Sequence, residues 1–350
     1  MWISQRIWLS QLQLSNEKIL MMIRKITVIG GSGFVGTNLC RQFHLKKQDF
    51  EIIDLKKSNQ FPEKCKIGDV RDLESLRATI SGDVVINLAA VHRDNVRDKT
   101  EYERTNVHGT QNVARVCTEK GIKKIIFTSS VAVYGFAEPG TAENGKINPF
   151  NAYGRTKFDA EEKLRDWQVS TGSSLIIVRP TVIFGEGNRG NVYNLLNQVA
   201  SGKFLMIGPG DNKKSMAYIL NVVAFLEKCI LADVKYGVYN YVDTPDLTMN
   251  ELVSQVRRTL TGRDGVGLRL PFFLGIVLGY LADGVARITG VNLPVSAIRV
   301  RKFVSTTEFK SSWSQLEGFR PRYTLKESID RTLDAEFINP DPNREIFYSE

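Results

Sequence analysis

The sequence predicts an α/β protein with a doubly wound parallel sheet and a smaller C-terminal lobe. Between Lys25 and Pro180, apolar strand-like runs alternate with helical patterns, as they do in repeated β-α-β units. These runs are apolar throughout rather than at every second residue, which is typical of parallel strands buried on both faces. A glycine-rich turn also joins the first strand to the first helix, as in a Rossmann-type sheet.

The strands predicted in this part of the chain are residues 25–30, 50–55, 65–68, 83–89, 123–129 and 174–180. The helical patterns between them cover residues 34–46, 72–80, 102–121 and 152–168. Right-handed crossovers through these helices cover both faces of the sheet. Farther along the chain, residues 236–243 again have a strand pattern, and residues 249–260 have the apolar spacing of an amphipathic helix.

These patterns divide the chain into two folded parts and two ends. The Rossmann domain is predicted to comprise residues 23–180 plus 216–243, and the smaller lobe residues 181–215 plus 244–340. Residues 1–22 are interpreted as an N-terminal extension outside the fold and not as a signal peptide, because polar residues interrupt each of their apolar runs. A helix that docks on a partner or on a membrane is the alternative for this segment. Residues 341–350 are interpreted as a tail.

Composition indicates a globular protein but does not choose its partner. The 350 residues include 42% hydrophobic and 24% charged residues, which excludes a disordered or collagen-like chain. The excess of 47 Lys and Arg over 38 Asp and Glu gives a net charge of +9. Such an excess is compatible with nucleic acid, with an anionic membrane surface or with an anionic small substrate.

The cysteines argue against a metal centre and against disulfide bonds. Cys40, Cys65, Cys117 and Cys229 are widely spaced, with no C-x-x-C pair and no neighbouring His. We therefore expect no bound metal and a reducing, cytoplasmic environment.

Residues 271–282 are the most hydrophobic segment of the chain. Twelve residues are too few to span a bilayer, and Asp283 follows directly. The length favours a buried or half-buried helix. The alternative is a helix at a membrane interface, with nearby cations meeting anionic headgroups, namely Arg269, Arg287, Arg299, Arg301 and Lys302. Peripheral membrane contact through residues 271–302 therefore stays open.

The glycine-rich turn has the pattern Gly-x-x-Gly-x-x-Gly and lies between a predicted strand and a predicted helix. Glycines let the backbone approach a pyrophosphate, and the helix N-terminus that follows offers free N–H groups and a positive dipole end. This context supports a dinucleotide site. The residues expected to hold the cofactor here are Gly30, Gly33, Phe34, Val35 and Gly36.

Two acids follow the next strands. Asp54 ends the second strand, where a carboxylate suits the adenosine ribose hydroxyls and repels a 2′-phosphate, so NAD is favoured. Lys56 and Lys57 leave NADP open, because they could neutralise such a phosphate. Asp69 and Val70 follow the third strand, where they would contact the adenine; a helix N-terminal acid is the alternative interpretation of Asp69.

A second constellation has the residue types of a catalytic site. Tyr153 and Lys157 are four residues apart and therefore share one face of a helix. Ser130 directly follows a predicted strand, at the edge of the sheet where ligands bind in doubly wound folds. The pair and the strand-end serine together are far more specific than either alone.

These motifs, in this order, resemble the extended short-chain dehydrogenase/reductase family, and within it the NAD-dependent nucleotide-sugar epimerase/dehydratase branch. The resemblance rests on GGSGFVG, on Asp54, on NLAA at 87–90, on TSSVAVYG and on YGRTK; it covers residues 25–180 well and 181–245 loosely. It implies NAD as cofactor, with further contacts from Leu88, Ala89, Ala90, Asn106 and Pro180. It also implies a homodimer formed through the helices at 100–120 and 153–170.

The resemblance gives each catalytic residue a role that agrees with its chemistry. A free tyrosine is a poor base at neutral pH, but Lys157 and the nicotinamide ring would stabilise its phenolate. Tyr153 would then take the proton of a sugar hydroxyl, while Ser130 hydrogen-bonds the same oxygen. Lys157 would also hold the nicotinamide ribose.

Two absences narrow the reaction. The dehydratase branch has an Asp-Glu pair after the serine, and the decarboxylase branch has a Glu shortly before the Tyr of VYG. This chain has Val131 and Ala132 there, and neither can move a proton. Dehydration and decarboxylation are therefore disfavoured, whereas epimerisation and simple oxidation or reduction need only the residues present.

The expected substrate is a nucleotide-diphosphate sugar, epimerised at C4 of a UDP-hexose. Its candidate contacts are Ser130, Arg189, Asn191 and Lys214. Val182 occupies a position where galactose-type epimerases usually have a diphosphate-binding Asn, so that sugar is not settled. An alternative is an NAD(P)-dependent dehydrogenase or reductase of a sugar, steroid or lipid-linked alcohol. A sensor that only binds NAD(P) is disfavoured by the intact Tyr153–Lys157 pair, and nucleic acid by the lack of a basic stripe.

Overall fold

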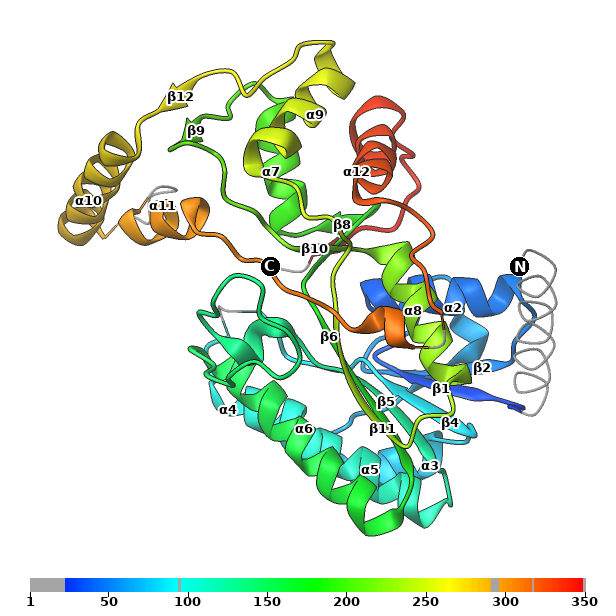
Figure 1. Cartoon of the computed structure of the whole chain (residues 1–350). Helices are drawn as coiled ribbons and strands as arrows, with labels where there is room; N and C mark the ends of the chain where they lie inside the picture. Colours follow the sequence, from blue (N-terminus) through cyan, green and yellow to red (C-terminus); the bar gives the residue numbers. More distant parts are fainter. Residues whose placement is uncertain (1–22, 94–95, 291–295, 317, 349–350) are drawn as a thin grey trace, which may run out of the picture.

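A computed structural model describes residues 23–93, 96–290, 296–316 and 318–348 (Figure 1). The predicted N-terminal extension, residues 1–22, lies outside the described residues.

The core is a seven-stranded parallel sheet in the order β11-β6-β5-β4-β1-β2-β3. This confirms the predicted fold class. Its strands are β1 (Ile26–Ile29), β2 (Phe50–Asp54), β3 (Cys65–Ile67), β4 (Val84–Asn87), β5 (Lys124–Thr128), β6 (Ser174–Pro180) and β11 (Tyr236–Tyr241).

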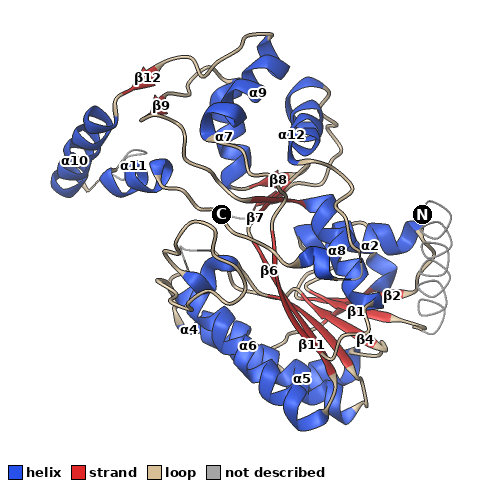
Figure 2. Cartoon of the chain, viewed as in Figure 1, coloured by secondary structure: helices blue, strands red, loops and turns tan. Residues whose placement is uncertain are grey.

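Helices cover both faces of the sheet, which is why its strands are apolar throughout (Figure 2). One face packs against α2 (Phe34–Leu45) and α8 (Ile219–Leu231), in a core that includes Leu39 and Phe225. The other face packs against α3 (Leu73–Thr79), α5 (Gly109–Glu119) and α6 (Ala152–Thr171), around Leu76, Val113 and Leu164. The predicted helix at 102–121 begins earlier, as α4 (Thr100–Tyr102) and a π-helical turn, Glu103–His108, before α5.

The smaller lobe lies beyond the carboxyl ends of the strands (Figure 1). Its helices are α7 (Asn191–Ala200), α9 (Met249–Thr261), α10 (Phe272–Thr289), α11 (Ala297–Val304) and α12 (Leu325–Leu333). Its short parallel strand pairs join β7 (Val182–Phe184) to β10 (Met216–Tyr218), β8 (Asn188–Arg189) to β13 (Phe347–Tyr348), and β9 (Met206–Ile207) to β12 (Arg269–Leu270). The predicted boundaries of the two parts remain an interpretation of this arrangement.

The hydrophobic segment at 271–282 is helical, but its large apolar side chains are more exposed than the expectation of a buried or half-buried helix implies. It forms most of α10, and Phe273 and Leu281 are each 62% exposed. The helix packs closely on the protein along its glycine edge, because a Cβ at Gly275 would lie 2.6 Å from the Ile207 side chain. Within the described residues, no helix combines the length and the apolar character needed to cross a membrane.

Candidate active site

A cleft of about 1010 Å³ lies between the carboxyl edge of the sheet and the smaller lobe. It is lined by most of the residues predicted to bind the cofactor, namely Gly30, Gly33, Phe34, Val35, Gly36, Asp54, Asp69, Val70, Leu88, Ala89, Ala90, Tyr153, Lys157 and Pro180. Ser130 and Asn191, predicted to contact the substrate, line it too. The structure therefore brings residues from all the sequence motifs to one cavity.

The glycines of the glycine-rich turn let backbone segments pack closely against one another and leave room for a ligand. Gly30 has a φ of +78°, and a Cβ there would lie 2.8 Å from the Ala89 backbone nitrogen. A Cβ at Gly36 would lie 2.5 Å from the Cα of Gly31, so the first turn of α2 packs directly on the loop. Gly33 differs, because a Cβ there would meet no protein atom closer than 3.4 Å. Gly33 thus leaves open the space that a phosphate would occupy.

Asp54 is held at the cleft by backbone donors. Its carboxylate accepts hydrogen bonds from the backbone nitrogens of Ser32, at 3.0 Å, and Lys56, at 3.1 Å. The Ser32 hydroxyl in turn donates to the Lys56 carbonyl oxygen at 2.9 Å. This network fixes the end of β2 to the glycine-rich turn. The carboxylate therefore occupies a defined position beside the predicted pyrophosphate site.

Asp69 also lines the cleft, and it does not cap a helix. Its carboxylate pairs with the Arg71 guanidinium at 2.7 Å, which lowers the pKa of Asp69 below its ordinary value. Arg71 reaches on to Glu101 at 2.8 Å. The N-cap of α3 is Asp72, whose side chain accepts from the nitrogens of Glu74 and Ser75. The alternative interpretation of Asp69 as a helix N-terminal acid is therefore wrong.

The catalytic candidates meet where β5 ends and α6 begins. Ser130 is the N-cap of a 3-10 turn, Val131–Tyr134, and its Oγ accepts from the Ala132 nitrogen at 3.1 Å. A Cβ at Gly154 would lie 2.4 Å from the Ala132 carbonyl oxygen, so the first turn of α6 lies directly against this 3-10 turn. That contact places Tyr153 beside Ser130, whose hydroxyl acts to lower the pKa of Tyr153.

The surroundings shift the pKa values of Tyr153 and Lys157 in opposite directions. Burial raises the pKa of Tyr153 to about 12, although the Ser130 hydrogen bond counteracts part of the rise. Burial lowers the pKa of Lys157 to about 7, and the Glu161 carboxylate opposes that fall. The Lys157 Nζ lies 4.1 Å from the centroid of the Phe127 ring. Both shifts favour the uncharged forms, so a bound cationic group is needed to stabilise a phenolate here.

Asn106 stands behind the wall of the cleft rather than in it. It is 1% exposed, and its carbonyl oxygen accepts from the Val91 nitrogen at 2.8 Å. Its amide nitrogen donates to the Val91 carbonyl oxygen at 3.1 Å and to the Thr156 hydroxyl at 3.0 Å. Asn106 therefore ties the loop after β4 to α6, beside Lys157, and acts here by positioning. The contact of Asn106 with the cofactor stays a prediction.

Two predicted substrate contacts have partners outside the cleft. Arg189 pairs with Glu336 at 2.7 Å, and its guanidinium stacks on the Tyr193 ring at 3.9 Å. The Lys214 ammonium donates to the carbonyl oxygens of Lys302, at 2.8 Å, and Ser305. Neither residue lines the cleft in this conformation. Their contact with substrate stays a prediction.

Sequence reasoning missed several residues that line the cleft. The hydroxyls of Thr128 and Ser129 are buried and have no hydrogen-bond partner in the described residues. Both belong to the TSSVAVYG motif, so their place beside Ser130 was a usable signal. The others come from distant segments and carry no local pattern, namely Ser215, Thr307, Phe309, Ile346, Phe347 and Tyr348.

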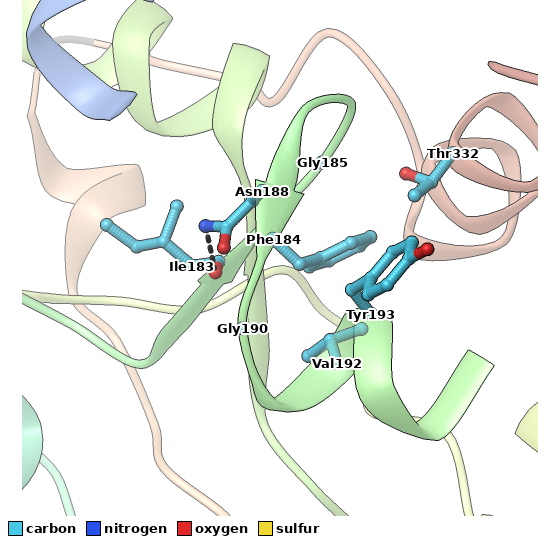
Figure 3. Close-up of a pocket in the computed structure, with 8 residues that line it drawn as sticks. All are labelled: Ile183, Phe184, Gly185, Asn188, Gly190, Val192, Tyr193 and Thr332. Carbon is cyan, nitrogen blue, oxygen red and sulfur yellow. Dashed lines mark hydrogen bonds between the residues drawn. The ribbon is translucent and has the colours of Figure 1, made fainter. Parts of the chain in front are cut away.

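A second cavity behind the substrate side is too small for a sugar. It measures about 10 Å³ and lies where β7, α7 and α12 meet, with Phe184 and Tyr193 beside Thr332 (Figure 3). That volume holds at most a water molecule. Beside it, the Asn188 amide nitrogen donates a hydrogen bond to the Ile183 carbonyl oxygen at 3.4 Å. This cavity is a packing feature of the wall and not a second ligand site.

The cleft fits a dinucleotide. No side chain caps the N-terminus of α2, so its first N–H groups have no side-chain partner at the glycine-rich turn. The open space at Gly33, the Asp54 carboxylate and the unpaired hydroxyls of Thr128 and Ser129 extend across the carboxyl edge of the sheet. The phosphates would meet the α2 N-terminus and the space at Gly33, and a ribose would meet Asp54. The nicotinamide end would lie toward Thr128 and Ser129.

Comparison with known proteins identifies relatives along nearly the whole chain. The sequence model of the NAD dependent epimerase/dehydratase family matches residues 26–241. The N-acetyl-alpha-D-glucosaminyl-diphospho-ditrans,octacis-undecaprenol 4-epimerase of Escherichia coli O157:H7 is 47% identical, over 93% of this chain and 99% of that protein. The UDP-glucose 4-epimerase of Vibrio cholerae is 26% identical, over 90% and 96%.

Solved structures share the fold. The UDP-N-acetylglucosamine 4-epimerase of Bacillus cereus superimposes with a TM-score of 0.69, covering 88% of this chain and 97% of its own, at 17% identity.

Proposed function

The chain belongs to the NAD-dependent epimerase/dehydratase family, and from that membership we propose that it inverts C4 of an N-acetylhexosamine joined through a diphosphate to a polyprenyl lipid. The observation that carries the substrate is the 47% identity, over nearly all of both chains, to an enzyme named for this lipid-linked sugar. The UDP-hexose expected from the sequence has the same diphosphate linkage and the same reaction at C4. The proposed substrate differs from it in two ways: the sugar is an N-acetylhexosamine, and the diphosphate carries a polyprenyl lipid instead of a nucleoside.

Bound NAD would supply the acceptor, and later the donor, of the C4 hydride. Tyr153 takes the proton of the C4 hydroxyl as the ketone forms and returns it when the alcohol is restored. Ser130 donates to the same oxygen and stabilises its developing charge. A protonated Lys157 would favour the Tyr153 phenolate, as the positive nicotinamide ring would. The 3-10 turn after Ser130 presents Val131 and Ala132 to the cleft, and neither carries a proton-transferring group.

The absence of a proton-transferring group after Ser130 favours epimerisation over elimination. Loss of water from the sugar needs a second acid or base near C5 or C6, and residues 131–134 offer only apolar side chains and one tyrosine. That residue, Tyr134, is 1% exposed and hydrogen-bonded to Asn240 and Arg179, so it is unavailable. The ketone therefore has one productive route, reduction from either face.

A lipid-linked substrate places the enzyme at a membrane surface, and the chain contacts that surface through residues 271–302 on the cytoplasmic side. A homodimer forms through the exposed faces of α5 and α6, as the resemblance implies.

The decisive experiment offers the purified protein both substrate classes. N-acetylglucosamine linked to undecaprenyl diphosphate and UDP-N-acetylglucosamine are incubated separately, without added cofactor, and the released sugars are identified. We expect conversion of the lipid-linked sugar at a kcat/KM at least about 10 times that for the nucleotide sugar, as different binding predicts. Denaturing the protein should release NAD, which mass spectrometry identifies. Turnover of UDP-N-acetylglucosamine alone would contradict the lipid-linked substrate but not the epimerase chemistry.

A further inference from the structure

Helix α10 turns its large apolar side chains outward, and two of its glycines, Gly275 and Gly279, face the protein. A Cβ at Gly279 would lie 2.7 Å from the Cα of Ala297, and Gly275 meets Ile207 in the same way, so the glycine edge faces α11 and β9. The exposed side carries Phe272, Phe273, Leu274, Val277, Leu278, Tyr280, Leu281 and Val285. This is the reverse of an ordinary surface helix, whose apolar stripe faces the core. A contiguous exposed apolar face of this kind marks an interaction site.

A second apolar feature lies on the other lobe. Phe136 and Phe150 are 72% and 52% exposed, and their rings stack with centroids 4.6 Å apart. They lie on the segments that follow Ser130 and precede Tyr153. The Lys302 ammonium of α11 lies 5.5 Å from the Phe150 ring centroid, which joins the two features across the lobes. We call them together the apolar rim: the exposed side of α10, Ile298 of α11, Phe136 and Phe150.

The charges on the α10–α11 side of the rim are almost all positive. Residues 266–305 contain five cations, all exposed, and one acid, Asp283. The Asp283 carboxylate already accepts from the Ala297 nitrogen at 3.1 Å. The cations are Arg269, Arg287, Arg299, Arg301 and Lys302. Apolar side chains flanked by Arg and Lys are typical of elements that lie in the interface of an anionic bilayer.

The rim is connected directly to the substrate end of the cleft. Helix α11 ends at Val304, and Thr307 and Phe309 line the cleft just beyond it. Phe309 packs on Tyr134, with ring centroids 5.8 Å apart, in the 3-10 turn that begins after Ser130. Phe136 and Phe150 flank the same turn. The rim therefore borders the opening through which the carrier attached to a bound sugar must leave.

We infer that the apolar rim seats the protein on an anionic phospholipid bilayer, with the substrate end of the cleft facing the lipid. This inference rests on the proposed function for its purpose, because the polyprenyl tail then stays in the bilayer while the diphosphate sugar enters. A second copy of the chain fits the rim less well, because a symmetric contact would bring these cations together. The diphosphate would approach through the zone of Arg301 and Lys302.

The test measures vesicle binding in the absence of any sugar substrate. Full-length protein is sedimented with vesicles of phosphatidylcholine alone and of phosphatidylcholine with phosphatidylglycerol. We expect binding to the anionic vesicles that weakens as salt rises. The variant carrying both Phe273→Gln and Leu281→Gln should bind about 10-fold or more weakly, because two large apolar side chains no longer enter the interface.

Two further variants make the result specific. Leu45→Gln is the matched control, because Leu45 is 68% exposed on α2, away from the rim, and should bind as wild type. Phe136→Gln should weaken binding although it lies on the other lobe, which tests whether both lobes contact the bilayer. Turnover of a short-chain, water-soluble diphosphate sugar should stay unchanged in all these variants, which shows that they are folded.

Three outcomes would overturn the inference. They are wild-type protein that does not bind anionic vesicles, rim variants that bind like wild type, and rim variants whose change is instead a lower oligomeric mass in solution. Failure of the proposed function looks different: vesicle binding persists, but no diphosphate sugar of either tail length is converted.

Discussion

The two halves of the cleft are constructed differently. In the dinucleotide half, most of the contributing segments directly follow or end a strand of the central sheet, as Gly30 follows β1, Asp54 ends β2 and Leu88 follows β4. In the substrate half, Asn191, Ser215 and Thr307 come from separate segments of the smaller lobe. A residue at a strand end is placed by the sheet itself, whereas the others are placed only by tertiary packing. Local motifs can therefore describe the first half but not the second.

The largest effect is expected from removing the Tyr153 hydroxyl, which lies where the two halves of the cleft meet. Tyr153→Phe should lower kcat by about 1,000-fold, because the proton acceptor at the reacting oxygen is lost. Bound NAD, measured on release from the denatured protein, should stay at the wild-type ratio. Activity within a few-fold of wild type would show that the base lies elsewhere.

A smaller loss is expected at Ser130, which touches the substrate oxygen but does not take its proton. Ser130→Ala should lower kcat by about 100-fold through loss of one donor at the developing charge. Ser130→Thr keeps a hydroxyl that can also accept from the Ala132 nitrogen, and should recover most of the activity. Equal losses in both variants would indicate a structural defect at the 3-10 turn.

The pH dependence of stability tests whether the buried amine of Lys157, in the dinucleotide half, is uncharged. The pKa of Lys157 is about 7 in the folded protein, against an ordinary value of 10.5 in the unfolded chain. Between these values the unfolded chain binds more protons, so stability should increase with pH by up to about 1.4 kcal/mol per unit. This gain begins near pH 7 and ends near pH 10.5.

The measurement compares wild type with Lys157→Met, both without added cofactor. Urea unfolding at pH 7 and pH 9 should show the wild type gaining about 2 kcal/mol relative to the variant, which lacks the titrating group. If the difference between the two proteins is the same at both pH values, Lys157 is not buried uncharged.

The smallest expected effect lies in the substrate half. Lys214 supports the end of α11 through two carbonyl contacts, so Lys214→Met should loosen the segment that carries Thr307 and Phe309. We expect KM to rise about fivefold at unchanged kcat, the size of effect that one or two hydrogen bonds give. The control is Lys213→Met, whose exposed pair with Glu308 contributes little. A fall in kcat without a change in KM would place Lys214 nearer the chemistry.

The same contrast explains what could be predicted from the sequence. The parallel sheet, the glycine-rich turn and the meeting of Ser130 with Tyr153 follow from continuous apolar strands and from short motifs at their ends. Arg189 and Lys214 had no comparable signal: their partners, Glu336 and the end of α11, are far along the chain. The sequence also left open whether α10 is buried or exposed, because a hydrophobic run gives no indication of which side its glycines will pack.

The last described residues lie over the dinucleotide half, and this has a consequence for turnover. β13 pairs with β8, Phe347 packs on Phe34 of the glycine-rich turn with ring centroids 5.7 Å apart, and the Asn59 amide donates to Glu345 at 2.7 Å. The C-terminal segment therefore covers the dinucleotide end of the cleft, whereas the substrate enters at the other end. Epimerisation returns its cofactor to the starting redox state in each cycle, so the dinucleotide does not need to leave between turnovers. The covering segment can stay in place while sugars exchange.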